Sequence, residues 1–208
     1  MYALVESGNI TRYFNNPKGF SLNGNQYSAD VFTKWTNTER EAIGIYEIIF
    51  DNSNYKSPKF FNNTDRTYTF NSSEGTVTAT FGTATAKPHA DVNWTQTEID
   101  DGDAPSGATT STIKTKGLKS ILIEEIKIQA GGILSKTDWY VTRKSEKSTD
   151  IPSNISTHRD AVRTKQAEME TAITNAADTA ALETLYTYTE QEDGTTTRPL
   201  GELPELES

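Results

Sequence analysis

The sequence predicts an α+β protein whose first part is rich in strands and whose second part is helical. Up to residue 86, short segments with alternating apolar and polar side chains are separated by turn signals, as is typical of β-hairpins. From residue 117, apolar residues recur at helical spacing. We therefore expect a β-rich module with hairpins and short helices over 1–86, and a small helical module over 117–188.

Two hairpins are predicted near the N-terminus. Residues 2–6 and 10–14 form the first, because a Ser-Gly-Asn turn separates two apolar segments. Asn23-Gly24 marks the second, since a type I′ turn needs a positive φ at both central residues. Ser28 is placed to cap a short helix that follows this hairpin.

A further short helix and three strands complete the predicted β-rich module. Thr38 stands three residues before Glu41, which is the spacing of a capping box, and Gly44 is placed to end this helix in a left-handed conformation. Residues 45–50 predict a strand. The segment 66–86 alternates aromatic residues and threonines on either side of a Ser-Glu-Gly turn, which predicts another hairpin.

Two polar segments border the helical module. Residues 87–116 are rich in Asp, Gly, Ser and Thr without periodicity, so we expect an acidic, polar linker or a long surface loop. Residues 189–208 form an acidic tail, in which Asp193-Gly194 is a turn signal that would fold the tail back.

The first helix of the helical module is predicted to begin at Leu118 and to stop at Gly131-Gly132. Alternating isoleucines also permit short strands in this segment, but its length favours a helix. The residues expected on its buried face are Leu118, Ile121, Leu122, Ile126 and Ala130.

Three further helices are predicted from capping residues and apolar stripes. Thr137 or Ser135 caps a short helix in the segment DWYVTRKSE. Ser153 or Asn154 begins the longest helix, and Asp178 caps a last short one. The residues expected to face the core are Ile155, Val162, Met169 and Ile173 on the longest helix, and Leu182, Leu185 and Tyr186 on the last.

The composition argues against several kinds of partner. A formal net charge of -9 over 208 residues, without a basic stripe, argues against binding to nucleic acid. The chain has no cysteine, which excludes disulfides and thiolate zinc sites, and no apolar run typical of a membrane span or a signal peptide. Only 34% of the residues are apolar, so each core is small. We expect a homo- or hetero-oligomer within an assembly.

No constellation of residues indicates catalysis or a bound cofactor. Asp100, Asp101 and Asp103 resemble part of a calcium loop but lack the EF-hand spacing, so an acidic surface loop is the simpler interpretation. Nothing in the sequence indicates that His89 and His158 meet. We therefore expect a non-enzymatic protein with no catalytic, cofactor-binding or metal-binding residues.

A cluster of interface-type residues follows the first long helix. Trp139, Tyr140 and Arg143 fall within about one helical turn, so a ring and a guanidinium can stack and form an anchor for a partner. The alternative is that Trp139 packs between this turn and the flanking helices, as aromatic residues usually do. Together with Arg159 and Arg163 on the longest helix, these three residues are the candidate interface.

Two segments resemble parts of tailed-bacteriophage tail proteins. The stretch Ile133–Arg163, with TDWYVTR, DIP and RDAVR, resembles the C-terminal segment of a loose group of such proteins. The stretch Gly19–Asn52 is similar to their N-terminal module, and the order and spacing of both segments match the group. The two segments cover less than half of the chain, and they contain no catalytic residues.

This resemblance implies a structural protein of the virion tail, made in the host cytoplasm, that acts as an adaptor or as a tail-fibre-linked component. Its partners would be other phage tail or fibre proteins. The alternative is a tail-fibre assembly chaperone, which binds a fibre only transiently. A third hypothesis is a glycan-binding module in which Trp35, Trp94 and Trp139 offer stacking platforms.

Overall fold

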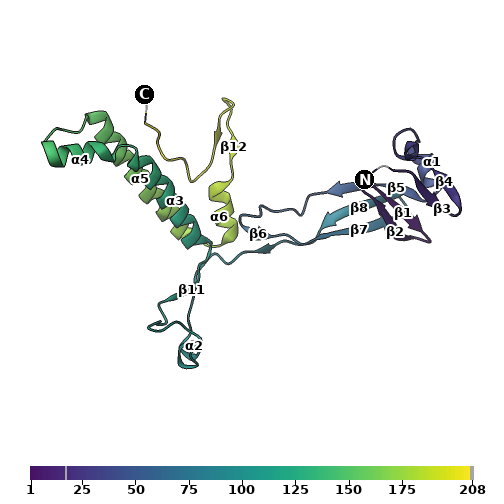
Figure 1. Ribbon diagram of the computed structural model, residues 1–208, viewed down its shortest axis with the longest axis horizontal. Coiled ribbons are helices and arrows are strands. Elements are labelled where there is room, and N and C mark those ends of the chain that lie inside the picture. The colour runs from purple at the N-terminus through teal and green to yellow at the C-terminus, as the bar shows by residue number, and fades with distance from the viewer. Residues whose placement is uncertain (17, 207–208) are drawn as a thin grey trace. The chain divides into compact units, whose positions relative to one another are not determined.

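The computed structural model describes residues 1–16 and 18–206 and confirms the α+β fold class. The chain divides into two compact units, Met1–Thr85 and Ala86–Ser208, called unit 1 and unit 2 below. Unit 1 is built mainly of strands, and unit 2 contains the long helices (Figure 1). No helix in the described part of the chain combines the length and the apolar character that a membrane span needs.

A five-stranded sheet with the order β2-β1-β5-β8-β7 forms the centre of unit 1. Its β5–β8 pair is parallel, and the β1–β2, β1–β5 and β7–β8 pairs are antiparallel. Two predicted hairpins are thereby confirmed as β1–β2 and β7–β8. The strands are β1 (Tyr2–Glu6), β2 (Asn9–Phe14), β5 (Ile45–Asp51), β7 (Arg66–Asn71) and β8 (Thr76–Phe81).

Both faces of this sheet are covered, as the three consecutive buried residues Ala3, Leu4 and Val5 of β1 show. Side chains alternate between the faces of a strand, so a run of buried residues requires apolar surroundings on both sides. Leu4 belongs to one apolar cluster, whereas Ala3 and Val5 belong to another.

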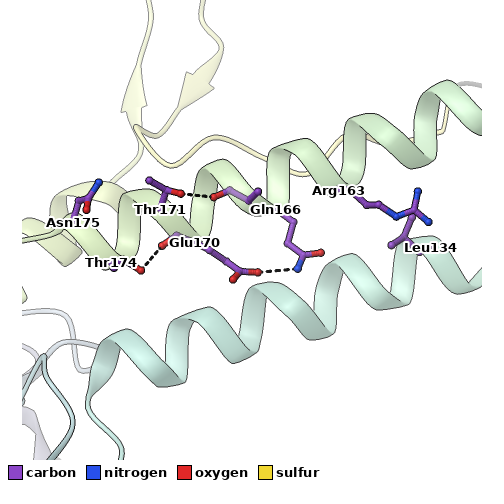
Figure 2. A pocket seen from close by; sticks show the side chains of 8 residues that line it. Leu134, Arg163, Gln166, Glu170, Thr171, Thr174 and Asn175 are labelled. Atoms are coloured by element: carbon purple, nitrogen blue, oxygen red, sulfur yellow. Dashed lines mark hydrogen bonds between the residues drawn. The ribbon is translucent and has the colours of Figure 1, made fainter.

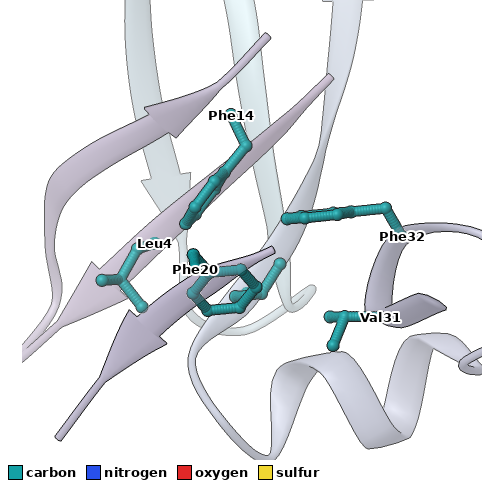
Figure 3. Packing of buried hydrophobic residues seen from close by; sticks show 6 residues of the cluster. Leu4, Phe14, Phe20, Val31 and Phe32 are labelled. Carbon is teal, nitrogen blue, oxygen red and sulfur yellow. The ribbon is translucent and has the colours of Figure 1, made fainter. Parts of the chain in front are cut away.

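The first cluster packs under the small elements that follow β2 (Figure 3). Its phenylalanine rings lie with centroids 4.9 to 5.6 Å apart. The covering elements are β3 (Phe20–Leu22), β4 (Asn25–Tyr27), the 3-10 helix η1 (Ala29–Phe32) and α1 (Asn37–Glu41). The buried members are Leu4, Phe14, Phe20, Val31, Phe32 and Ile45.

The second cluster lies on the other face, and its buried members are Ala3, Val5, Ile48, Val77 and Ala79. The rings of Tyr13 on β2 and Tyr68 on β7 approach to 4.9 Å between centroids, although these are the two edge strands. The sheet must therefore be strongly curved. Two short strands, β6 (Phe61–Asn62) and β9 (Thr85–Ala86), lie outside this sheet.

The turns and caps of unit 1 follow the sequence with one correction. Asn23 and Gly24 have φ angles of 50° and 80°, as expected for the β3–β4 turn, and Ser28 caps η1. Gly44 has φ of 79°, and a Cβ on it would lie 2.7 Å from the carbonyl oxygen of Val5. The capping box of α1, however, is formed by Thr36 and Glu39. The prediction of Thr38 and Glu41 is wrong.

The first part of unit 2 has more structure than the sequence predicts. Within residues 87–116 lie β10 (Val92–Asn93), α2 (Gln96–Asp100) and β11 (Ile113–Thr115), and β10 pairs with β11. A capping box of Thr95 and Glu98 begins α2. The Asp91 carboxylate accepts hydrogen bonds from Gly117 N at 2.7 Å and Ser120 Oγ at 2.6 Å. The expected lack of regular structure is therefore wrong.

Two antiparallel helices, α3 (Leu118–Ser135) and α5 (Ser153–Asn175), form the centre of unit 2 (Figure 1). The predicted core residues of α3 and α5 are confirmed, except that Ile121 is 40% exposed. Of the three predicted on the last helix, Leu182 is buried, whereas Leu185 and Tyr186 are only half-buried. The predicted stop at Gly131-Gly132 is also wrong, because α3 continues to Ser135. The buried residues are Leu118, Leu122, Ile126 and Ala130 of α3, and Ile155, Val162, Met169 and Ile173 of α5.

The C-terminal part of unit 2 folds back on its helices. Asp178 caps α6 (Thr179–Tyr186), as predicted, by accepting a hydrogen bond from Ala181 N at 2.8 Å. The hairpin of β12 (Thr189–Glu190) and β13 (Thr196–Thr197) turns at Gly194, which confirms the predicted turn. Leu200 is then fully buried, and its backbone N–H donates to the carbonyl oxygen of Leu185 at 3.0 Å.

Candidate functional site

Helix α4 (Asp138–Lys147) joins α3 to α5 and contains no buried residue. Its N-cap residue is Thr137, as predicted, but the Thr137 side chain makes no capping bond. The hydroxyl of Thr137 instead donates to the carbonyl oxygen of Leu134 at 3.0 Å. Apolar burial therefore contributes little to the position of α4, and polar contacts at its start must hold it.

Arg159 of α5 supplies these polar contacts. Its side chain is only 7% exposed, and it donates to Leu134 O at 2.8 Å, Thr137 Oγ1 at 2.7 Å and Asp138 Oδ1 at 2.9 Å. The guanidinium thus binds the last turn of α3 and the first residue of α4 at once. Removing it would take the charged donor away from all three acceptors, which is costly. The structure places this candidate interface residue inside unit 2, where it fixes the direction of α4.

Trp139, Tyr140 and Arg143, called the α4 cluster below, lie together on the exposed helix. The two rings have centroids 4.0 Å apart, and the guanidinium carbon lies 4.7 Å from the Trp139 centroid and 5.3 Å from the Tyr140 centroid. Trp139 is 52% exposed, so it does not pack between helices. The spacing of three and four residues brings the guanidinium over both rings.

Arg163 lies apart from the α4 cluster. It borders a groove of about 670 Å³ between α5 and the end of α3 (Figure 2). Its guanidinium contacts Asp160 at 3.3 Å, and no contact joins it to the α4 cluster among the described residues. Most of the groove is polar: Gln166 donates to Glu170 at 2.8 Å. The other lining residues are Leu134, Ala167, Thr171, Thr174 and Asn175.

The three tryptophans have different surroundings. Trp35 is partly buried in unit 1, where it packs against the first cluster and meets the ring of Tyr27 edge-on at 6.0 Å. Trp94 is partly covered by Lys114, whose Nζ lies 4.7 Å from the ring centroid. Trp139 alone among them is more than half exposed.

The histidines and aspartates that could have formed a catalytic or calcium site make separate contacts in the fold. The backbone carbonyl of His89 accepts a hydrogen bond from Lys119 N at 3.0 Å, whereas His158 borders a cavity of about 410 Å³ beside the C-terminal segment. Asp100 accepts from Gln96 at 2.8 Å within α2. In the part of the chain that the structure describes, no three His, Asp or Glu side chains are grouped so that they could hold a metal ion.

The internal role of Arg159 is the functional feature that sequence reasoning misses. Its signal is present, because Arg159 lies four residues after Ile155 and three before Val162, on the apolar stripe of α5. A charged residue on such a stripe is buried only when its donors find acceptors. Those acceptors lie more than twenty residues away in the sequence, and only the fold brings them close.

Comparison with known proteins identifies no relative. The chain matches no described protein family, no curated protein and no solved structure.

Proposed function

We propose that this chain is a non-enzymatic structural protein of a tailed-bacteriophage tail, acting as a virion adaptor or as a tail-fibre-linked component through protein–protein contacts. The α4 cluster is the observation that carries the proposal, because it presents two aromatic rings in contact and an arginine over both of them, on a helix without buried residues. Tryptophan, tyrosine and arginine are the residue types most enriched at interface hot spots.

The resemblance of Ile133–Arg163 to phage tail proteins supports the same location for the contact. This stretch includes the α4 cluster and also Thr137, Asp138 and Arg159, which hold α4 in place. A rigid support lowers the entropy that an anchor loses on binding. The matched stretch therefore contains both the proposed contact and the residues that orient it.

A tail-fibre assembly chaperone is the second candidate, and the groove beside α5 favours it. The groove is open and lined mainly by polar or small side chains, among them Gln166, Thr171 and Thr174 (Figure 2). Transient partners generally use modest, polar interfaces, whereas permanent ones bury larger apolar areas. A chaperone would hold a fibre segment there and then release it.

Mass spectrometry of purified, intact particles tests the proposal. A structural tail protein is expected at a fixed copy number relative to the other tail proteins. Detection of the chain in the infected lysate but not in the particles would reject the virion role and favour the chaperone.

The variant Trp139→Ala tests the proposed contact itself. Since Trp139 is half-exposed, we expect the circular dichroism spectrum of the variant to match that of the wild type. The free energy of unfolding of the variant should fall by about 1 kcal/mol or less. Incorporation into particles should be lost. Val141→Ala, which shortens another exposed residue of α4, is the matched control and should assemble normally. Normal incorporation of Trp139→Ala would exclude the α4 cluster as the contact.

A further inference from the structure

Three arginines of the described chain each lie over two aromatic rings, and two of them also donate hydrogen bonds to acceptors within the fold. Arg66 in unit 1 lies 4.9 Å from the ring centroid of Phe50 and 4.1 Å from that of Phe81. Its terminal nitrogens donate to Ala79 O at 3.0 Å and to the side-chain oxygen of Asn52. The stacked guanidinium therefore also binds acceptors of the fold through both of its terminal nitrogens.

Arg198 in unit 2 follows the same arrangement. Its guanidinium carbon lies 5.2 Å from the Tyr186 centroid and 5.3 Å from the Tyr188 centroid. Its Nε donates to Gly201 O at 3.1 Å, and a terminal nitrogen donates to the Glu202 carboxylate at 2.8 Å. A carboxylate thus completes this cluster, and the Tyr188 hydroxyl donates to the same carboxylate at 2.5 Å.

Arg143 has the stacking but lacks the acceptors. Its Nε is buried without a hydrogen-bond partner, and no ion pair or hydrogen bond reaches its terminal nitrogens among residues 1–16 and 18–206. The nearby acidic residues do not supply one: Asp138 binds Arg159, and Glu146 makes no ion pair with Arg143 in this part of the chain. The terminal nitrogens reach solvent, so an acceptor from outside can approach them.

The charge around Arg143 fits an acidic partner. Residues 136–147 contain four basic and two acidic residues, a net charge of +2 within a chain of net charge -9. Lys136, Lys144 and Lys147 are exposed. A polyanion such as nucleic acid needs several phosphate-binding side chains and would be repelled by the rest of the chain. A carboxylate on a protein segment needs only the fork of one arginine.

We propose that the α4 cluster binds an acidic protein segment, with a partner Asp or Glu accepting two hydrogen bonds from the terminal nitrogens of Arg143. An apolar neighbour of that residue then covers the exposed ring of Trp139. This inference rests on the proposed function and names the chemistry of the partner. In the Arg198–Glu202 pair of unit 2, a carboxylate likewise accepts from an arginine that lies over two aromatic rings, there through one terminal nitrogen.

Titration with poly-L-glutamate, followed through the Nε–H signals of ¹⁵N-labelled arginine side chains, tests the proposal. The Arg143 signal is identified by its loss in Arg143→Lys. We expect it to shift saturably. The signals of Arg66 and Arg198 should stay unchanged, because two nitrogens of each guanidinium already bind acceptors within the fold. An unmoved Arg143 signal, or an equal shift of the exposed Arg163 signal, would overturn the proposal. An equal shift with heparin would overturn it too, because the site would then bind any polyanion.

Two variants separate the geometry of the site from its charge. Arg143→Lys keeps the charge but loses the planar fork, so we expect poly-glutamate to bind about tenfold more weakly. Lys147→Gln removes one charge and should change the affinity by about twofold at most. Equal effects of the two variants would refute a specific role of Arg143. These results do not depend on where the chain resides, so failure here is distinct from absence in virions.

Discussion

The two compact units are stabilised in different ways. Unit 1 surrounds a curved sheet with apolar clusters on both faces, and the terminal nitrogens of Arg66 in its arginine–aromatic cluster bind internal acceptors. Unit 2 relies on one apolar face per long helix and on polar contacts between distant segments, such as Thr179 Oγ1 to Lys87 O at 2.7 Å. The unit with less apolar packing is the one that presents an incomplete site at Arg143.

This difference indicates that the residues that stabilise the fold and the residues that are free to bind a partner lie in different parts of the molecule. A side chain buried within a covered sheet contributes to folding and is inaccessible to partners. Helix α4 has no such residue, and a buried arginine at its base orients it. Changes on α4 should therefore alter binding with little effect on folding, whereas changes in unit 1 should do the opposite.

The largest effect is expected from Ile45→Ala, which removes a fully buried side chain of β5. The cavity should lower the free energy of unfolding of unit 1 by about 2–5 kcal/mol. Amide signals of residues 1–85 should melt earlier, while those of unit 2 keep their wild-type midpoint. Leu122→Ala, in the core of α3, is the matched variant and should act on unit 2 alone. Joint melting of both units in either variant would show that their stabilities are coupled.

A smaller loss is expected from Arg159→Met. Methionine keeps much of the apolar stem but removes the charged donor that Leu134 O, Thr137 Oγ1 and Asp138 Oδ1 share, which costs about 1–3 kcal/mol. Amide hydrogens of residues 138–147 should exchange faster, as α4 loses its attachment. Arg163→Met, on the exposed side of α5, is the control and should change stability by about 0.5 kcal/mol or less. Unchanged exchange in Arg159→Met would mean that α4 is held by other contacts.

The smallest effect concerns pH and the start of α2. Hydrogen bonds lower the pKa of Glu98 from its ordinary value of 4.5 to about 2. The bond from Lys114 has the largest effect, and those from Thr95 have smaller ones. A lowered folded-state pKa stabilises the fold above the unfolded-state value, and this contribution is lost as pH falls. Amide signals of residues 96–100 should therefore change between about pH 4.5 and pH 2. Glu98→Gln should remove this step, and a step that persists would assign it to another carboxylate.

The sequence is informative where one local signal decides the structure. Asn23-Gly24 predicts its hairpin because few residues adopt positive φ, and Asp178 predicts its cap because its carboxylate reaches the helix start. It is ambiguous where signals compete. Thr36 and Thr38 both stand three residues before a glutamate, and only the first pair forms the capping box of α1.

Tertiary contacts decide the remaining differences. Glycines predict the end of α3, yet the helix continues to Ser135, and Arg159 of the distant helix α5 donates to Leu134 O in this last turn. The α4 cluster could be predicted as one helical turn, since spacing alone places its rings and guanidinium together. The exposure of Trp139 and the lack of acceptors around Arg143 could not be predicted from the sequence. Both depend on which residues the fold brings next to α4.

The contacts that close unit 2 also order its assembly during translation. Every residue of unit 1 has been synthesised by Thr85, so its sheet can form as soon as this segment leaves the ribosome. Unit 2 is completed later. The Lys87 carbonyl oxygen accepts a hydrogen bond from Thr179, 92 residues further along the chain, and the buried Leu200 is synthesised later still. A nascent chain can therefore carry a finished sheet while its helices are still incomplete, and α4 is synthesised before the segments that follow α5.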